Sequence, residues 1–399
     1  MKTKAGEAIR ATLLISLMTS VTVLSTRSRA DTETCGTATT TLPFTDVMGN
    51  PFFCQIAEAF FSGLANGTSA TTYSPAANVT REQMAAFITR TMDQSLKRGS
   101  RRAALKQFWT PTSGEDLRLT TVGIGPQSVE SDGADLWVTN ITGAGGGTVS
   151  RVRASDGKLL ETWTGATLAS GVVAAKGLIF VTGNTSPGKL YQIDPTQPAG
   201  VVATVTSSLG GGTGGISFDG ARIWTANSSP GSVSIVTLNP LSVTTVTAGF
   251  TLPRGILYDG ANIWVTDNGT LPGKIFKLDS NGTIIQTVTM GDAPGFPVFD
   301  GTNIWVPDSN AVRVVRASTG AVLATLTGNG LSDLTAAAFD GERILVTNPS
   351  GNSVSLWKAA DLSPLGPVSI GANTGPIGAC SDGLNFWITL QFAGKLARF

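Results

Sequence analysis

Asp259-Gly260-Ala261-Asn262-Ile263-Trp264-Val265 is one of seven versions of the same pattern in this chain, and their repetition indicates the fold. Each version has a glycine turn, a few further residues, and an apolar run centred on a large side chain. Asp-Gly between apolar runs is a strong hairpin signal, so each version predicts two antiparallel strands. The turn glycines are Gly133, Gly177, Gly220, Gly260, Gly301, Gly341 and Gly383, which stand 40 to 44 residues apart.

Each repeat also contains further strand-like runs, such as Ser232–Val236 and Val243–Ala248. Four strands in a unit of about 40 residues are typical of one blade of a β-propeller. The central apolar runs do not alternate with polar residues, which fits strands buried on both faces between neighbouring blades. The sequence therefore predicts a mainly β protein with a seven-bladed β-propeller over residues 117–399.

The two ends of this region predict how the ring closes. The seventh repeat stops at Phe399 and supplies only a third strand, while the run Leu117–Val122 precedes the first repeat. We expect this run to complete the seventh blade and to remove the open sheet edge. The repeats resemble those of bacterial seven-bladed propellers, including the surface-layer and quinoprotein-like kinds, and this resemblance implies the fold rather than a function.

Composition excludes several classes of function. Of 399 residues, 14% are charged and the net charge is +1, which argues against a nucleic-acid partner recruited by bulk electrostatics. Histidine is absent. That excludes a Ser-His-Asp triad, a Cys-His pair and any histidine-ligated metal site in this chain.

Residues 1–30 have the pattern of a cleaved export signal. Lys2, Lys4 and Arg10 precede the apolar run Ala11–Leu24, and small residues lead to Ala30. This run is shorter than the ~20 residues that a membrane span needs. We expect export to the periplasm, the cell surface or the medium, with an uncleaved anchor as the alternative and no span in the mature chain.

The three cysteines fit an exported protein. Cys35 and Cys54 lie in one short segment, and a disulfide between them stabilises it by about 3 kcal/mol in the chain-entropy model. Cys380 is the odd one and lies in an apolar run. We expect it to be a buried free thiol, because no cation flanks it.

Residues 31–92 predict a small module with two helices. Asn50 precedes Pro51 as a helix N-cap, and an apolar stripe begins at Phe53. Thr80 and Gln83 form a capping box at the start of the second helix. Its inner face is expected to contain Met84, Phe87, Ile88 and Met92. Residues 93–116 contain a basic cluster, for which we favour a solvated linker over contact with an anionic surface.

Four pieces of this module resemble one S-layer homology motif. They are Phe44-Thr45-Asp46-Val47, Gly67-Thr68, Tyr73-Ser74-Pro75 and the run Val79–Phe87, in that order and spacing. In that family three motifs usually build one domain that holds proteins to cell-wall polysaccharide, and this chain has one. The resemblance implies glycan contacts for Thr80, Arg81 and Glu82, with Arg81 donating to an acidic group. The alternative is that Thr80 only caps the helix and that Arg81 and Glu82 are solvated.

A second set of candidate residues lies three positions after the central residue of each repeat. Six repeats place an amide or carboxylate at or beside this position, and the seventh has Leu390. Such a ring is suited to sugar hydroxyls or a calcium ion, and no other cofactor or metal is expected. We favour the alternative that these residues serve turns. The candidates are Asn140, Asn184, Asn227, Asp267, Asp308 and Asn348, with Arg254 as a cation near the same mouth.

These observations predict an exported, envelope-associated binding or structural protein. Its motif contacts cell-wall or envelope polysaccharide, and its propeller is a platform for a ligand or for other envelope proteins. The alternative is an enzyme on the propeller face: a lyase, a quinoprotein-like oxidoreductase, or a carboxylate-based glycosidase using Asp267 and Asp308. Propellers of the streptogramin lyase kind use a histidine base, and this chain has none.

Overall fold

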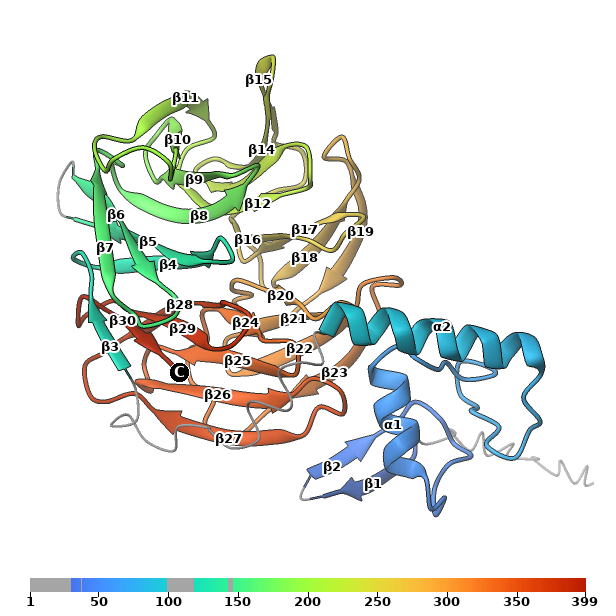
Figure 1. Ribbon diagram of the computed structural model, residues 1–399. Helices are drawn as coiled ribbons and strands as arrows, with labels where there is room; N and C mark the ends of the chain where they lie inside the picture. Colours follow the sequence, from blue (N-terminus) through green and yellow to red (C-terminus); the bar gives the residue numbers. More distant parts are fainter. Residues whose placement is uncertain (1–29, 37, 99–117, 143–145) are drawn as a thin grey trace, which may run out of the picture.

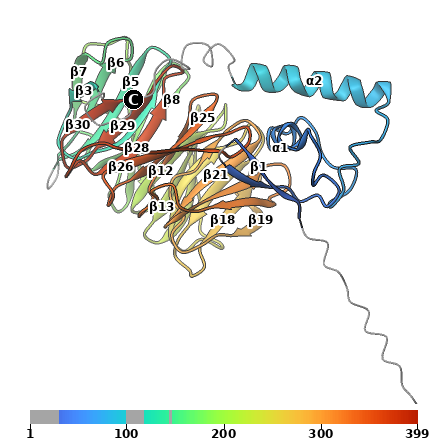
Figure 2. The same ribbon diagram turned by 90° about the horizontal axis from the view of Figure 1, so that it is seen from below.

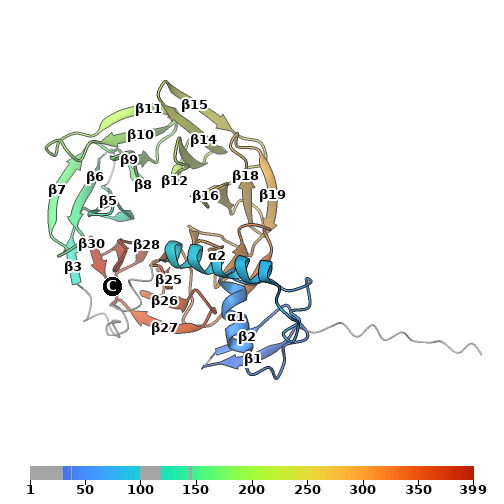
Figure 3. The same ribbon diagram turned by 45° about the vertical axis from the view of Figure 1, so that its right-hand side comes forward.

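The computed structural model describes residues 30–36, 38–98, 118–142 and 146–399, and its main part is a ring of seven four-stranded antiparallel sheets (Figure 3). Residues 1–29 of the predicted export signal and most of the predicted linker lie outside the described residues. In each sheet the first strand lies innermost and the fourth lies at the rim. The mainly β, seven-bladed fold that the repeats predict is confirmed.

The blades are numbered in chain order. Blades 1 to 4 consist of β4 Pro126–Ser131, β5 Asp135–Ile141, β6 Gly147–Arg153 and β7 Leu159–Thr164; β8 Ala169–Ala175, β9 Leu178–Gly183, β10 Gly188–Ile193 and β11 Ala203–Leu209; β12 Thr213–Phe218, β13 Ile223–Ser228, β14 Gly231–Leu238 and β15 Leu241–Val246; and β16 Pro253–Tyr258, β17 Ile263–Asp267, β18 Lys274–Leu278 and β19 Ile284–Thr289. Blades 5 to 7 consist of β20 Val298–Phe299, β21 Asn303–Asp308, β22 Ala311–Arg316 and β23 Val322–Leu326; β24 Ala337–Phe339, β25 Arg343–Asn348, β26 Ser353–Lys358 and β27 Pro364–Ser369; and β28 Pro376–Ser381, β29 Phe386–Leu390, β30 Lys395–Arg398 and β3 Arg118–Thr121.

The ring is closed by β3, the fourth strand of blade 7. It pairs antiparallel with β30, with Arg118 opposite Arg398 and Thr121 opposite Lys395. One blade is thus built from both ends of the repeat region, as the sequence predicts. This pairing leaves no open blade edge between the first and last repeats.

The repeated aspartate ties its turn to the buried tryptophan. Asp259 Oδ1 accepts the backbone N–H groups of Ala261 and Asn262 at 2.8 and 2.7 Å, and its Oδ2 accepts the indole N–H of Trp264 at 2.7 Å. The same Asp-to-indole bond recurs in blades 1, 3, 5 and 7. The turn needs glycine because φ at Gly260 is +94°.

Two blades lack this aspartate-to-indole bond. In blade 2 a lysine, Lys176, replaces the aspartate and Phe180 replaces the tryptophan, so acceptor and donor are lost as a pair. In blade 6 Leu345 occupies the tryptophan position. There the carboxylate of Asp340 accepts Arg343 Nε at 2.9 Å instead.

Threonines on the second strands connect adjacent blades. Thr266 Oγ1 accepts the N–H of Gly255 in its own blade at 2.8 Å and donates to the carbonyl of Gly295 in the next blade, also at 2.8 Å. Four other blades repeat this pair of bonds. The threonines are Thr139, Thr182, Thr347 and Thr389, and the last connects blade 7 to blade 1.

The N-terminal part contains a hairpin and two helices. The hairpin, β1 Thr32–Cys35 and β2 Ala38–Thr41, is not expected from the sequence, because both strands are short and largely polar. The helices are α1 Phe53–Phe61 and α2 Arg81–Arg98. The second helix therefore runs six residues into the segment expected to be a linker, whose residues 93–98 are mostly good helix formers. Cys35 and Cys54 form a disulfide.

This module packs against the sides of blades 5 and 6 (Figures 1 and 2). Its apolar residues share one core with theirs, so that Phe61 belongs to the same buried cluster as Trp305 and Trp357. Asn303 Nδ2 donates to the carbonyl of Phe61 at 2.9 Å. Two helices and a small hairpin cannot bury a sufficient core alone, and the propeller completes it.

The expected inner face of the second helix is not buried. Met84 is 49% and Ile88 60% exposed, because α1 and the hairpin occupy the propeller contact and α2 extends away from it (Figure 1). The expected cap of the first helix also differs. The helix starts at Phe53, and Asn50 Oδ1 instead accepts the N–H of Phe52 at 2.8 Å in the turn before it.

Candidate functional site

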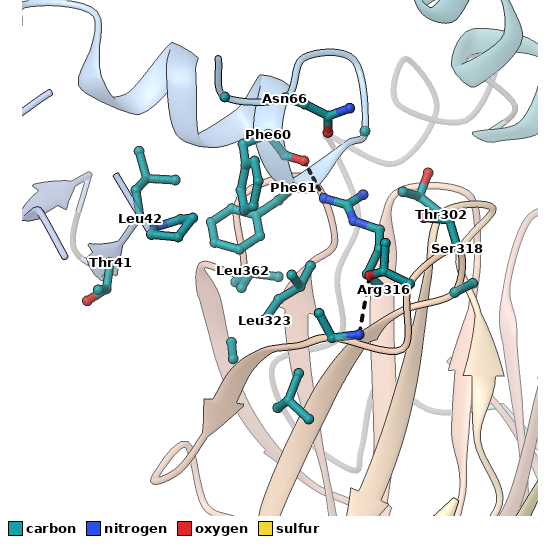
Figure 4. A pocket seen from close by; sticks show the side chains of 18 of the residues that line it. Thr41, Leu42, Phe60, Phe61, Asn66, Thr302, Arg316, Ser318, Leu323 and Leu362 are labelled. Atoms are coloured by element: carbon teal, nitrogen blue, oxygen red, sulfur yellow. Dashed lines mark hydrogen bonds between the residues drawn. The ribbon is translucent and has the colours of Figure 1, made fainter. Parts of the chain in front are cut away.

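A groove of about 1180 Å³ lies between the module and the propeller (Figure 4). We call it the interface groove. Its walls come from two regions that are far apart in sequence, within residues 30–70 and 259–362. From the module they include Thr41, Leu42, Phe60, Phe61 and Asn66, and from blades 5 and 6 they include Thr302, Arg316, Ser318, Leu323 and Leu362.

The interface groove combines an apolar wall with a fixed cation and polar groups. Phe60, Leu323 and Leu362 supply the apolar surface (Figure 4). The guanidinium of Arg316 lies 5.4 Å from the centre of the Phe60 ring, and its Nη2 donates to the Phe60 carbonyl at 2.8 Å. An apolar face beside hydroxyl, amide and guanidinium groups is suited to a polar ligand with flat apolar patches, such as a sugar chain.

The separate pieces of the S-layer-like motif meet in the folded module. The carboxylate of Asp46 accepts the backbone N–H groups of Tyr73 and Ser74 at 2.8 and 2.7 Å. The rings of Phe44 and Tyr73 lie 5.3 Å apart. The spacing of these residues in sequence therefore has a structural cause.

The three candidate glycan residues of the motif lie at the start of α2, away from the interface groove. Thr80 and Gln83 form the reciprocal capping box, with N–H to side-chain oxygen distances of 2.9 and 3.2 Å. No part of this turn is buried, so the side chains of Arg81 and Glu82 are exposed. The geometry thus gives Thr80 a capping role and leaves the two charged side chains accessible.

Three asparagine candidates occupy the same position on the second strands of their blades, and all three are buried there. Asn140, Asn227 and Asn348 are each 0% exposed. Each Nδ2 donates to a hydroxyl on the third strand of the same blade, as Asn227 does to Ser234 at 3.0 Å and Asn348 to Ser355 at 2.9 Å. The Asn-to-serine pairing follows from antiparallel register, which sets these side chains beside the third strand.

The two aspartate candidates hold the loops that enter their blades. Asp267 accepts backbone N–H groups of Thr251, Leu252 and Gly269 at 2.7 to 3.0 Å. Asp308 pairs with Arg313 Nε at 2.7 Å and also accepts two backbone N–H groups. Both carboxylates are 2% exposed.

These positions favour the alternative in which the amides and carboxylates serve the fold rather than a ligand. Among these amides and carboxylates only Asn184 is exposed, and the others are used by strands and turns. Within the described residues no group of three or more Cys, Asp or Glu side chains is arranged to hold a metal. The calcium site stays a prediction without a coordinating cluster in that part of the chain.

Two charged residues on the innermost strands remain. Arg254 on β16 is half-buried, and its guanidinium carbon lies 5.6 Å from the centre of the Phe296 ring. Burial lowers the pKa of Arg254, and Asp333 partly offsets this. Glu130 on β4 is also half-buried, and burial raises its pKa to about 7. Burial likewise raises the pKa of the neighbouring free thiol of Cys380.

No protein-family model matches this chain, and no curated protein matches its sequence. Solved structures with a similar fold include hydrazine synthase of Kuenenia stuttgartiensis, with a TM-score of 0.60 and 16% identity over 69% of this chain and 95% of that one. Virginiamycin B lyase from Staphylococcus aureus has a TM-score of 0.55 and 17% identity, covering 71% of this chain and 99% of that one. A streptogramin B lyase has a TM-score of 0.56 and 15% identity over 72% and 99% of the two chains. At these identities the likeness shows the seven-bladed propeller fold and nothing of its chemistry.

The described residues include no helix that is both long and apolar enough to cross a membrane.

Proposed function

We propose that this chain is an exported, envelope-associated binding protein that holds cell-wall polysaccharide at its N-terminal module. The propeller serves as a platform for a further ligand or for another envelope protein. The observation that carries this proposal is the interface groove, which both parts of the chain build together. The S-layer-like motif supports a glycan as its occupant.

We infer that the propeller takes the place of the further motifs against which a single motif would otherwise pack. Alone, the module has too small a core to offer a firm groove. When the module packs against the propeller, the groove also has the wall formed by Arg316, Leu323 and Leu362. A polysaccharide lying there reaches apolar and polar groups on both sides.

An enzyme on the propeller face is less well supported. Its best candidate pair, Asp267 and Asp308, consists of buried carboxylates that already accept several hydrogen bonds. A glycosidase needs one carboxyl that can give a proton to substrate and one that meets the sugar or a water. Neither is placed to do so here.

Co-sedimentation with purified cell walls tests the proposal. Ser318 is exposed on the turn between β22 and β23 at the interface groove, and Ser318→Trp fills part of it. We expect the bound fraction to fall at least about fivefold, the loss produced by roughly 1 kcal/mol. The matched control is Ser280→Trp on the equivalent turn of blade 4, outside the groove, which should bind like the parent.

A second pair of variants separates the groove from the motif's charged turn. Arg81→Ala removes the cation implied by the motif, and Arg90→Ala removes an exposed cation about two and a half turns along the same helix. Loss of sedimentation in Arg81→Ala alone supports a direct contact there. Unchanged sedimentation in both Ser318→Trp and Arg81→Ala contradicts the proposal, since the module would then have no role in wall binding.

A further inference from the structure

The seven innermost strands carry only two charged side chains, Glu130 and Arg254, among the described residues. Arg254 follows Pro253, which pairs with Asp267 at the end of the blade where the loop from blade 3 enters. The opposite end of β16 leads to Asp259, which lines the interface groove. Arg254 therefore lies at the face of the ring away from that groove.

The guanidinium of Arg254 has no hydrogen-bond or ion-pair partner within the part of the chain that the structure describes. The guanidinium carbon lies over the Phe296 ring, 5.6 Å from the ring centre, and Asp333 acts on it only through longer-range electrostatic attraction. Several other arginines of the ring are paired with a carboxylate, as Arg313 is with Asp308 at 2.7 Å and Arg151 with Asp135 at 2.7 Å. A half-buried cation without a counter-charge costs free energy, which a bound anion recovers.

The positions that correspond to Arg254 on the preceding blades carry small or polar uncharged residues. Register places Gln127, Ser170 and Gly214 at the corresponding position of blades 1, 2 and 3. A Cβ built on Gly214 would meet only the backbone oxygen of Arg254, at 3.9 Å, so this position carries no side chain that crowds Arg254. The other two supply an amide and a hydroxyl at the same level, suited to the polar groups of a ligand.

We propose that Arg254 binds the carboxylate of a small acidic ligand, such as an acidic sugar, at the face of the propeller opposite the interface groove. This inference rests on the proposed role of the propeller as a ligand platform and names the chemistry of that platform. A guanidinium can donate two parallel N–H bonds to a carboxylate, and here the guanidinium carbon lies 5.6 Å from the centre of the Phe296 ring. Asp333 is close enough to act on Arg254 electrostatically, which favours a monoanion over a phosphate dianion.

Calorimetric titration of the mature chain tests this site, with glucuronate, glucose and inorganic phosphate as probes. We expect saturable glucuronate binding at millimolar concentration, no binding of glucose and weaker binding of phosphate. Arg254→Gln should weaken glucuronate at least about tenfold, and Arg254→Lys should keep part of the affinity because it keeps the charge. Arg153→Gln, which removes an exposed arginine paired with Asp156, is the control and should bind like the parent.

Thermal unfolding without ligand distinguishes a binding cation from a structural one. Arg254→Gln removes an unneutralised charge, so its midpoint should equal or exceed that of the parent; a clear fall would assign Arg254 to packing and overturn the proposal. Glucuronate binding that is unchanged in Arg254→Gln, no saturable binding up to about 50 mM, or phosphate bound as tightly as glucuronate would each overturn it as well. Wall sedimentation of Arg254→Gln is measured in parallel and should be normal, so failure of this site does not count against the module's role.

Discussion

The residue that does most to organise this fold is the aspartate of each Asp-Gly turn. Its two carboxylate oxygens have separate tasks, because one fixes the turn and the other anchors the indole of the buried tryptophan. The hairpin signal in the sequence explains the first task alone. The second explains why the aspartate and the tryptophan disappear together in blade 2.

A substitution in blade 4 tests this double role. Asp259→Ala should lower the free energy of unfolding by about 2–3 kcal/mol, because it leaves the indole N–H of Trp264 and two backbone N–H groups without an acceptor. Asp156→Ala, in an exposed turn, should cost much less, because solvent can replace the hydrogen bonds that this carboxylate makes. Urea denaturation measures both, and equal losses would argue that the bond to the indole contributes nothing.

Glu130 predicts a pH dependence of stability. Its folded pKa of about 7 lies above the ordinary value of 4.5, so the folded chain binds this proton more tightly than the unfolded chain does. The resulting stability is fully present below pH 4.5 and is lost as the pH rises through 7. The full loss amounts to at most about 3 kcal/mol.

Glu130→Gln should therefore unfold at a higher urea concentration than the parent at pH 8 and at a similar one at pH 4. Glu161→Gln is the control, since Glu161 is paired with Arg151 at 2.7 Å and its loss should not produce this pattern. Parallel pH profiles of the parent and Glu130→Gln between pH 4 and 8 would contradict the assignment.

Among elements, β3 has the largest effect for its length because it joins the two ends of the ring. The backbone N–H of Thr120 faces β30, as does that of Val122, which donates to Gly394 O at 3.1 Å. The hydroxyl of Thr120 also donates to the carbonyl of Gly157 in blade 1. Thr120 therefore contributes to the closure through its backbone and through its side chain.

Thr120→Pro should lower stability by more than the roughly 3 kcal/mol of a proline in a regular element, because it also opens the ring. Gln286→Pro on the rim strand β19 is the matched control, since Gln286 likewise bonds to the following blade, at Thr319 O. That blade stays connected by its own hairpins, so a smaller fall in the thermal midpoint is expected. Equal falls would show that closure adds nothing.

The sequence predicts elements well where one rule repeats and poorly where contacts are made once. Seven turn signals at a steady period predict the number of blades, and the incomplete seventh repeat predicts the strand that closes the ring. Position within a strand is harder, because the residue three places after the tryptophan looks like a loop residue yet faces the third strand, as Asn227 does. The hairpin β1–β2 has no apolar pattern and escapes prediction.

At the scale of the whole molecule, the interface groove is the feature that no local pattern predicts. Residues 39–70 and 302–362 meet there only because the module lacks a core of its own and docks on blades 5 and 6. The motif pointed to the start of α2 instead, at Arg81 and Glu82. The interface groove and Arg254 lie toward opposite faces of the ring, which allows the molecule to hold two ligands at once.

Hydrogen exchange with and without purified wall polysaccharide reports directly on whether the glycan lies in the interface groove. We expect slower exchange in both walls of the interface groove together, within residues 39–44 and 318–326, and no change on the distant rim strands of blades 1 and 2. Slower exchange confined to the first turn of α2, or none anywhere in the module, would contradict this placement of the glycan.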